Sequence, residues 1–414
     1  MNIQDFETYG WNIEELDHTG QTILHVAAEN DNVPLIKMLL KKRNNKSFME
    51  LKDEDGNTPI LDAAWKNNCE AFKVLHSAGA SLSACSNFDQ TILSAATRSN
   101  SVQIVQYLAF TEPDIVKTLC YERNFLHDTP LHVVAKTGNI EIFNALIQFY
   151  ENVNPLNSSN ETPLHLAVKF NSIEIVKQIL KLSTFSVCLN SAEGTPLMIA
   201  VEKGFVTIVE MLIKNNATKK LKIMERKILL QISIYHKRYQ VLKLLSKDLS
   251  KHLLDQNDID KILQHSLKLS IIEEFIESVE YFLNRNDWKN LMRRRPKTEL
   301  NSILKSPMQL LIEHLPQMAL IVFDKCFVVA YITVLSKTKE VTFADYEFLD
   351  DVYFIQNNSK VLKNEDLSTY DKATGKLKPE AKSRANPYNK IVADHPLQLM
   401  VKNNNIKFIY INFS

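Results

Sequence analysis

Histidines and one cysteine are the side chains whose placement could carry chemistry in this sequence. His25, His132 and His165 each stand three residues after a threonine, and imidazole is a common metal ligand and general base. The nearest cysteine and histidine that could act together are Cys326 and His314. The sequence holds no glycine-rich phosphate loop, no HExxH and no GxSxG motif. We therefore expect packing to explain the segment around Cys326, and we predict no catalytic residues, no cofactor and no metal site.

Charge and cysteine usage exclude several other classes of protein. The chain has 49 basic and 48 acidic residues, so its net charge of +1 does not favour nucleic acid or an anionic membrane as a partner. Its five cysteines include no CxxC pair, which argues against a disulfide framework or zinc site and for a reducing, intracellular compartment. The basic run at 293–295 would suit nuclear import or phosphate binding, but a solvated helix end is the interpretation that we favour.

A repeat with a period of 33 residues organises the first 260 residues. The strings TILHVAA, TPILDAA, TILSAA, TPLHVVA, TPLHLA and TPLMIA begin at residues 22, 58, 91, 129, 162 and 195. Each lies thirteen residues before a second apolar block with helical spacing. Degenerate copies near residues 228 and 261 give successive intervals of 36, 33, 38, 33, 33, 33 and 33. The pattern predicts a helix–turn–helix unit that cannot bury its apolar face alone and must stack.

The residue types at fixed positions of the repeat predict how each unit is built. Threonine at the first position can cap a helix, and proline at the second occupies the first helical position, where no N–H is needed. The capping threonines are Thr129, Thr162 and Thr195, each followed by a proline, and Thr22 and Thr58 are the structural threonines at the same position of their repeats. A left-handed residue is expected nine positions later, where the sequence has Asp31, Asn67, Asn100, Gly138, Asn171 and Gly204. Asparagine thus replaces glycine, of which the chain has eight, and we predict positive φ at Asn67, Asn100 and Asn171.

The period, the TPLH-type tetrapeptides and the apolar block that follows them resemble ankyrin repeats. The resemblance is strong over residues 20–215 and weakens over 216–285. It implies that His25, His132 and His165 are structural, bridging adjacent repeats by hydrogen bonds. We favour this role over a metal or catalytic one. It also implies a surface that binds protein partners without naming any of them.

The C-terminal third is expected to start with helices and continue into strands. Ser306 and Pro307 form a cap pair, Pro316 should break and restart the helix, and 327–335 and 341–349 suggest a two-stranded hairpin. The apolar stretch 318–335 is almost long enough to cross a bilayer. Two central charges make a buried helix followed by a strand the better interpretation.

These C-terminal segments resemble the cytosolic region that precedes the membrane in ankyrin-type transient receptor potential cation channels, the TRPA subfamily. Trp288 with its basic stretch resembles the last ankyrin-like turn of that family. Residues 307–326 resemble its linker helix–turn–helix, and 396–406 resemble its pre-channel helix. Members of the family continue into membrane helices and a pore. On this interpretation the chain is a partial or truncated product, or a soluble form, and alone conducts no ions.

The resemblance also bears on electrophile sensing, which vertebrate members of the family perform through linker cysteines. Three of those positions hold Leu291, Ser306 and Met318 here, so Cys326 is the remaining candidate for a reactive thiol. Lys325 would favour the thiolate and Asp324 would oppose it. We expect a buried, inert cysteine and little or no electrophile sensing at the linker.

Three functions follow from these observations. The leading hypothesis is the cytosolic ankyrin and linker portion of a TRPA-type, calcium-permeable cation channel, a homotetramer that couples a stimulus or partner to the pore at the cytoplasmic side of the plasma membrane. The alternative is a soluble, cytoplasmic ankyrin-repeat adaptor that mediates protein–protein interaction. An enzyme with an ankyrin targeting array is the third, and we disfavour it.

The expected fold is mainly α, an ankyrin-repeat solenoid followed by a helix–turn–helix and β-hairpin linker without transmembrane helices. We predict an N-terminal cap (1–21), six clear repeats (22–215), degenerate repeats (216–285), a linker (286–356), a disordered loop (357–394) and a pre-channel helix (395–414).

Overall fold

The computed structural model describes residues 13, 15–42, 46–182, 190–218, 221–249, 255–292, 305–334 and 337–344. Backbone contacts divide the chain into two compact units, Met1–Thr218 and Lys219–Ser414. Helices make up most of the described residues, so the predicted mainly α fold class is confirmed.

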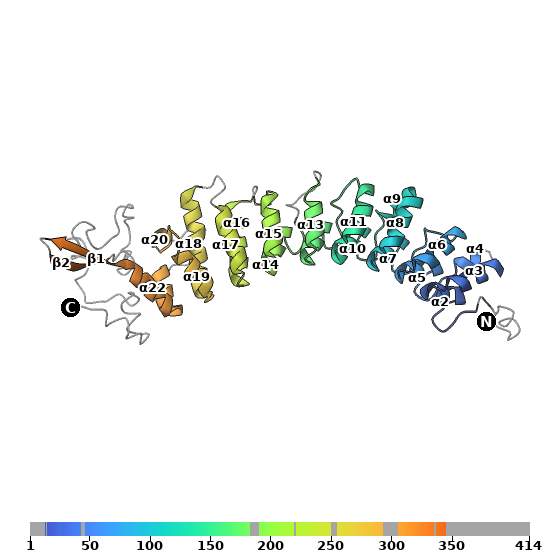
Figure 1. Cartoon of the computed structure of the whole chain (residues 1–414), viewed down its shortest axis with the longest axis horizontal. Coiled ribbons are helices and arrows are strands. Elements are labelled where there is room, and N and C mark those ends of the chain that lie inside the picture. Colours follow the sequence, from blue (N-terminus) through green and yellow to red (C-terminus); the bar gives the residue numbers. More distant parts are fainter. Residues whose placement is uncertain are drawn as a thin grey trace, which may run out of the picture. The chain divides into compact units, whose positions relative to one another are not determined.

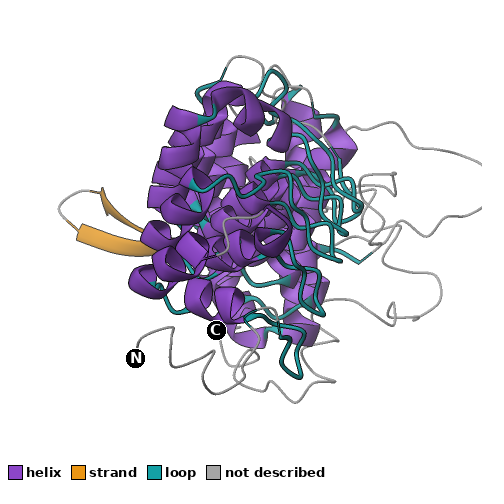
Figure 2. Cartoon of the chain, turned by 90° about the vertical axis from the view of Figure 1, so that its right-hand side faces the viewer, coloured by secondary structure: helices purple, strands orange, loops and turns teal. Residues whose placement is uncertain are grey.

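The first unit is a series of helix pairs that lie side by side in chain order (Figure 1). The pairs are α2 (Ile23–Glu29) with α3 (Val33–Lys42), α5 (Pro59–Trp65) with α6 (Cys69–Ser77), α7 (Ile92–Arg98) with α8 (Val102–Thr111), α10 (Pro130–Thr137) with α11 (Ile140–Leu146), α12 (Pro163–Lys169) with α13 (Ile173–Ile179), and α14 (Pro196–Lys203) with α15 (Val206–Lys214). The first helices pack on one another and form one layer, and the second helices form another. Figure 2 shows the connecting loops, in teal, gathered on one side of the helices.

The repeated residues begin and end these helices as the sequence predicts. The hydroxyl oxygens of Thr22, Thr91, Thr162 and Thr195 accept a hydrogen bond from a backbone N–H in the first helical turn. Positive φ at Asn67 (63°), Asn100 (62°) and Asn171 (56°) confirms the predicted left-handed turns. Gly138 and Gly204, with φ of 78° and 79°, occupy the same position in their own repeats.

Two short helices explain the intervals that exceed 33 residues. Helix α4 (Lys46–Met49) lies in the first long interval, and α9 (Pro113–Leu119) lies in the second. Helix α9 begins at a proline and buries Val116 and Leu119. The repeat pattern did not predict either helix, because a period marks where units recur and says nothing of what an insertion forms.

The second unit starts with longer helix pairs. They are α16 (Ile223–Tyr235) with α17 (Tyr239–Leu249) and α18 (Gln256–Ile272) with α19 (Ile276–Leu283). Their turns have positive φ at Lys237 (52°) and Glu274 (50°). Lys237 is nine residues after 228, as expected, but Glu274 is thirteen residues after 261. The turn of the faint eighth copy thus lies four residues later than the 33-residue spacing would place it.

The linker helices follow their sequence signals. Helix α20 (Trp288–Met292) precedes α21 (Pro307–His314), where Ser306 accepts from the Gln309 N–H and Gln309 Oε1 accepts from the Ser306 N–H. Helix α21 ends before Pro316, and α22 (Pro316–Cys326) starts there. The predicted break and cap are both confirmed.

The predicted hairpin is present with a different register. Strands β1 (Phe327–Val334) and β2 (Lys337–Ala344) are antiparallel, and Val334 pairs with Lys337. The second strand begins four residues before the predicted residue 341, so the polar SKTKE segment is mostly strand and not loop.

The apolar stretch 318–335 is divided between α22 and β1, as predicted. In the described part of the chain, no helix has the length and apolar character needed to cross a membrane. The basic run 293–295, the proposed disordered loop 357–394, the pre-channel helix 395–414 and most of the N-terminal cap lie outside the described residues.

The left-handed turn residues generate a stability prediction. Asn171 is exposed and has a φ of 56°, a conformation that costs an alanine about 1–2 kcal/mol. Asn171→Ala should lower the free energy of unfolding by about that amount in urea titrations, whereas Asn171→Gly should preserve or raise it. Equal losses in both variants would contradict the role of the turn.

Candidate functional site

Histidines at one position of the repeat join neighbouring units. The His132 Nδ1 atom accepts a hydrogen bond from the Thr129 N–H (3.1 Å), and its Nε2 atom lies 3.0 Å from the Glu161 carbonyl oxygen in the next repeat. His25 repeats this geometry with Thr22 (3.1 Å) and the Asn57 carbonyl (3.1 Å). Because a carbonyl only accepts, Nε2 carries the proton and the imidazole is neutral. His165 accepts from the Thr162 N–H (3.1 Å) in the same way.

Burial keeps the imidazoles of His25 and His132 neutral. His25, His132 and His165 are fully buried. Desolvation lowers the pKa of His132 to about 4, and it also lowers the pKa of His25. The rings of His25 and His132, whose two nitrogens are already engaged by the backbone, are not available to a substrate or metal ion. Among the described residues, no group of His, Cys, Asp and Glu is arranged to hold a metal ion.

Thr58 is the exception among the predicted structural threonines. Leu61 stands where three of the repeats have histidine, and the Thr58 hydroxyl has no hydrogen-bond partner although it is buried. Helix α5 therefore starts without a side-chain cap. Thr195, with Met198 at the histidine position, still caps the Met198 N–H at 3.3 Å.

The loops that precede each first helix are tied to one another at their tips. Backbone N–H groups donate from Glu54 to the Thr19 carbonyl (3.1 Å), from Asn87 to Asp55 (2.9 Å), from Ser158 to Leu126 (3.2 Å) and from Ala192 to Ser159 (3.4 Å). The close approach needs glycine at 56, where a Cβ atom would lie 2.7 Å from the Asn87 nitrogen. The backbone of the tips is thereby held, and their side chains remain exposed.

Large apolar side chains occupy the tips of the third and fourth repeats. Phe88, Phe125 and Leu126 are 53%, 53% and 42% exposed. The Phe88 and Phe125 rings meet edge to face with centroids 6.3 Å apart. Exposed apolar groups that cluster across repeats indicate an interaction site. We call these three residues with the exposed side chains of Glu54, Asp55 and Trp65 the tip surface.

Charged side chains of the first helices lie beside the tip surface. The Arg98 guanidinium lies over the Trp65 ring at 5.4 Å, a cation–π distance. Lys136 pairs with Asp128 (2.6 Å), and Lys169 pairs with Glu161 (3.3 Å) and Glu193 (2.6 Å). The basic groups of repeats three to five therefore already have partners within the array.

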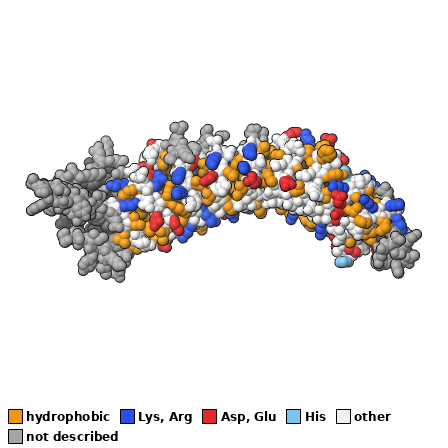
Figure 3. All heavy atoms as spheres, viewed as in Figure 1, with side chains coloured by type: hydrophobic (Ala, Val, Ile, Leu, Met, Phe, Trp, Pro, Cys, Tyr) orange, Lys and Arg blue, Asp and Glu red, His pale blue; other side chains and the backbone are white. Residues whose placement is uncertain are grey.

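Acidic residues gather where the first and second repeats meet, and one of their carboxyl groups is buried. Asp62 is 3% exposed and its Oδ2 atom has no hydrogen-bond partner. Burial, followed by the charges of Asp53 and Glu29, raises the Asp62 pKa to about 8. Figure 3 shows acidic side chains, in red, gathered over the part of the first unit around α5 and α6. We call Glu29, Asp53, Asp55 and Asp62 the acidic cluster.

The structure does not give Cys326 the surroundings of a reactive thiol. Its side chain is 2% exposed, so a reagent in solution cannot reach the sulfur. The Lys325 ammonium donates to the Leu283 carbonyl and to Asn284 Oδ1 (3.0 Å), and it lies over the Trp288 ring at 5.5 Å. Lys325 thus contacts residues of α19 and α20 and the residue between them. Burial therefore decides how accessible the Cys326 thiol is.

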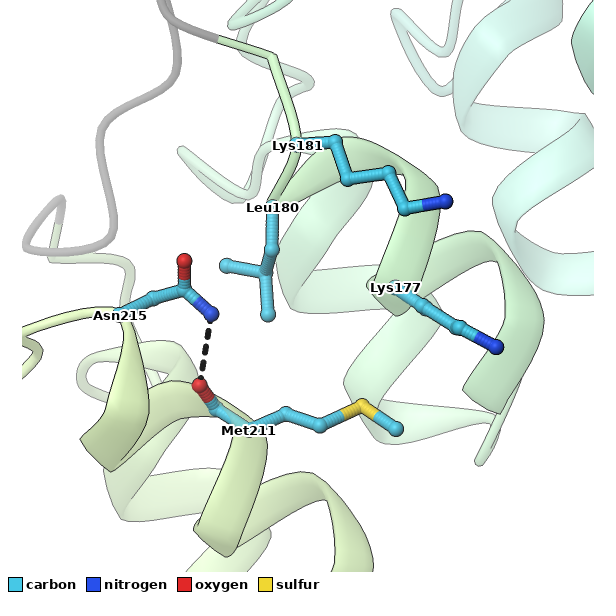
Figure 4. A pocket seen from close by; sticks show the side chains of 5 residues that line it. All are labelled: Lys177, Leu180, Lys181, Met211 and Asn215. Carbon is cyan, nitrogen blue, oxygen red and sulfur yellow. Dashed lines mark hydrogen bonds between the residues drawn. The ribbon is translucent and has the colours of Figure 1, made fainter.

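A shallow pocket of about 170 Å³ lies between α13 and α15. Figure 4 shows Lys177 and Lys181 extending on one side of it and Met211 along its floor. Lys181 donates to Gln178 Oε1 (3.4 Å), and Lys177 lies 3.7 Å from Glu174. Its partly exposed lysines and small volume are not those of a site for a drug-sized ligand.

Comparison with known protein families decides what the repeats are. The family described as "Ankyrin repeats (3 copies)" matches residues 4–84 and 109–190, and "Ankyrin repeat" matches residues 194–221. The chain is an ankyrin-repeat protein. Ankyrin repeats are protein-interaction modules, which agrees with a surface rich in exposed apolar groups and poor in catalytic ones.

Several proteins with different roles share this similarity. The chain is 31% identical over 136 residues to a transient receptor potential cation channel subfamily A member 1 homolog of Caenorhabditis elegans, which covers 29% of this chain and 10% of that protein. It is 26% identical over 137 residues to the nuclear factor NF-kappa-B p105 subunit of Gallus gallus, covering 33% and 14%. The human ASB11 ankyrin repeat domain is 23% identical with a TM-score of 0.43, covering 49% of this chain and 87% of that one. The chain thus spans about a seventh or less of these two curated relatives.

Reasoning from the sequence missed the tip surface and the acidic cluster. Phe88, Phe125 and Leu126 stand three or four residues before a capping threonine, so the repeat register could have located them. Asp62 could have been found as the one polar residue at a position where the other clear repeats hold Val26, Ala95, Val133, Leu166 and Ile199.

The histidine bridges generate a pH prediction. The pKa of His132 is about 4 in the folded chain and near 6.5 when unfolded, so the unfolded state binds more protons between these values. Stability should fall as pH drops below 6.5, with His132 contributing about 2 kcal/mol of that loss at pH 5. His132→Leu should be less stable than the parent at pH 7 and lose less between pH 7 and 5 in urea titrations. An unchanged pH slope in this variant would contradict the assignment.

Thiol accessibility provides a second prediction with an internal control. Cys85 is exposed and Cys326 is buried. Peptide mapping after brief iodoacetamide treatment of the folded chain should find Cys85 modified and Cys326 unmodified, and both modified in urea. Equal native labelling of the two thiols would contradict the burial of Cys326.

Proposed function

We propose that this ankyrin array binds protein partners through its tip surface. The observation that carries the proposal is the cluster of Phe88, Phe125 and Leu126, which are exposed across two adjacent repeats on a backbone held by tip-to-tip hydrogen bonds. A pre-formed apolar surface binds at a low cost in conformational entropy. Aromatic side chains are also those that most often dominate binding energy at interfaces.

A finer proposal is that the chain is the cytosolic ankyrin and linker portion of a TRPA-type cation channel. The similarity to the Caenorhabditis elegans TRPA1 homolog supports it, as does a linker of α21 and α22 that follows the array. In that role the array would pass the displacement caused by a partner or stimulus to the pore, because repeats that contact only their neighbours flex cumulatively. The assembled channel would be a homotetramer at the plasma membrane.

An adaptor without a pore is the alternative, and the same tip surface would serve it. The resemblance to other ankyrin proteins, including the NF-kappa-B p105 subunit, supports this role equally. Sequencing of complete transcripts discriminates the two. Six apolar spans encoded downstream of residue 414 would support the channel, and a stop codon in every transcript would support the adaptor.

Site-specific photocrosslinking tests partner binding directly. Benzoylphenylalanine at position 88 or 125 in the full chain, expressed in cells, should give discrete crosslinked adducts. Position 110 is the matched control, because Phe110 is 88% exposed on α8 and lies outside the tip surface. Adducts of equal yield at all three positions, or none at 88 and 125, would contradict the proposed surface.

A further inference from the structure

We propose that the second to fourth repeats bind an extended segment of a partner protein in which a lysine or arginine lies near a large apolar residue. The basic side chain would lie in the acidic cluster, and the apolar one would pack on Phe88, Phe125 and Leu126. The inference rests on the proposed protein-binding function and assigns the chemistry of the partner.

Asp62 is the residue that points to a ligand. The other clear repeats hold an apolar residue at its position, four residues after the capping threonine. The Oδ2 atom of this carboxyl group is buried without a hydrogen-bond partner, which destabilises the folded chain relative to an apolar side chain. Folding therefore does not explain the aspartate. A cationic group from outside the chain would give it the partner that it lacks.

The groups around Asp62 are suited to such a cation. The negative charges of Asp53 and Asp55 in the loop before α5, and of Glu29 on α2, help to raise the pKa of Asp62. Lys66, one turn further along α5, lies 3.5 Å from Glu29 and is the counter-charge that these groups share. Lys52 donates to the Cys85 carbonyl at 2.9 Å and is directed to the next loop. The acidic side chains thus exceed the basic ones here.

The remaining residues of the surface indicate the second feature of the partner segment, its large apolar residue. Arg98 is stacked on Trp65, Lys136 and Lys169 are paired with carboxylates, and Arg123 donates to the Leu156 carbonyl (2.6 Å), so these cations of the described residues already have partners within the array. The apolar tips of repeats three and four lie next in the series, beyond the Asp55 to Asn87 backbone bond. An extended segment that follows the tips would meet carboxylates first and aromatic rings next.

The ionisation of Asp62 should couple binding to pH. A cation favours the carboxylate, whereas the free chain holds Asp62 largely protonated at pH 7 because its pKa is about 8. Binding then releases a proton, so affinity should rise about tenfold between pH 7 and pH 9. The charged groups that face Asp62 are Glu29 from α2, Asp53 and Asp55 from the loop, and Lys66 from α5. Arginine in the ligand stays charged over this range.

A randomised twelve-residue peptide library displayed on phage tests the inference against the full chain. Counter-selection uses the full chain carrying Phe88→Ser and Phe125→Ser. Binders should be enriched in arginine or lysine close to leucine or aromatic residues and depleted of aspartate and glutamate. Fluorescein-labelled copies should bind about tenfold more weakly to Asp62→Leu in anisotropy titrations, a loss of about 1.4 kcal/mol. Asp62→Leu restores the residue type of the other repeats, so it should fold at least as stably.

The controls separate this inference from the proposed function. Phe110→Ser and Glu151→Gln change an exposed aromatic and an exposed acidic residue outside the surface and should leave affinity unchanged. Binders that need Phe88 and Phe125 but are acidic or neutral, or that ignore Asp62→Leu, would overturn the basic–apolar assignment and leave the binding surface standing. Absence of binders, or binders indifferent to Phe88 and Phe125, would also overturn it.

Discussion

Stacking of neighbouring repeats is the constraint on which the first unit depends. A helix of seven or eight residues, such as α10 or α12, is too short to be stable alone in water. Each pair therefore requires the next pair to cover its apolar side, and the bridges from His25 and His132 to the following repeat fix how closely the units approach. Because those bridges use backbone atoms at both ends, they tolerate almost any side chains on the exposed side.

That tolerance explains where function can reside. The tip-to-tip hydrogen bonds hold the loops through main-chain atoms, so most side chains at the tips can vary without loss of the scaffold, with Gly56 as an exception. In this chain they are acidic in the second repeat and aromatic in the third and fourth. Among the residues that the structure describes, Asp62 is a buried carboxyl group at a position that is apolar in the other clear repeats, and the buried Thr58 hydroxyl at the same helix start has no hydrogen-bond partner.

The sequence predicts what is repeated and fails where the repeat ends. The TPLH-type strings locate helix starts and the left-handed turns at Asn67, Asn100 and Asn171, because each rests on a local steric or hydrogen-bonding rule. They could not predict helix α9, the shifted eighth repeat or the register of the β-hairpin, since those depend on packing between segments. The sequence predicts only that the histidines bridge neighbouring repeats. The structure identifies the carbonyl groups that they contact.

The central claim is that adjacent repeats are coupled through these histidine bridges and distant ones are not. Native hydrogen–deuterium exchange of the full chain and of His132→Leu measures this most directly. The account predicts faster exchange in α10, α12 and the 157–161 loop of the variant, with α2 and α5 exchanging at their original rates. Uniform acceleration throughout the first unit, or an unchanged 157–161 loop, would contradict it.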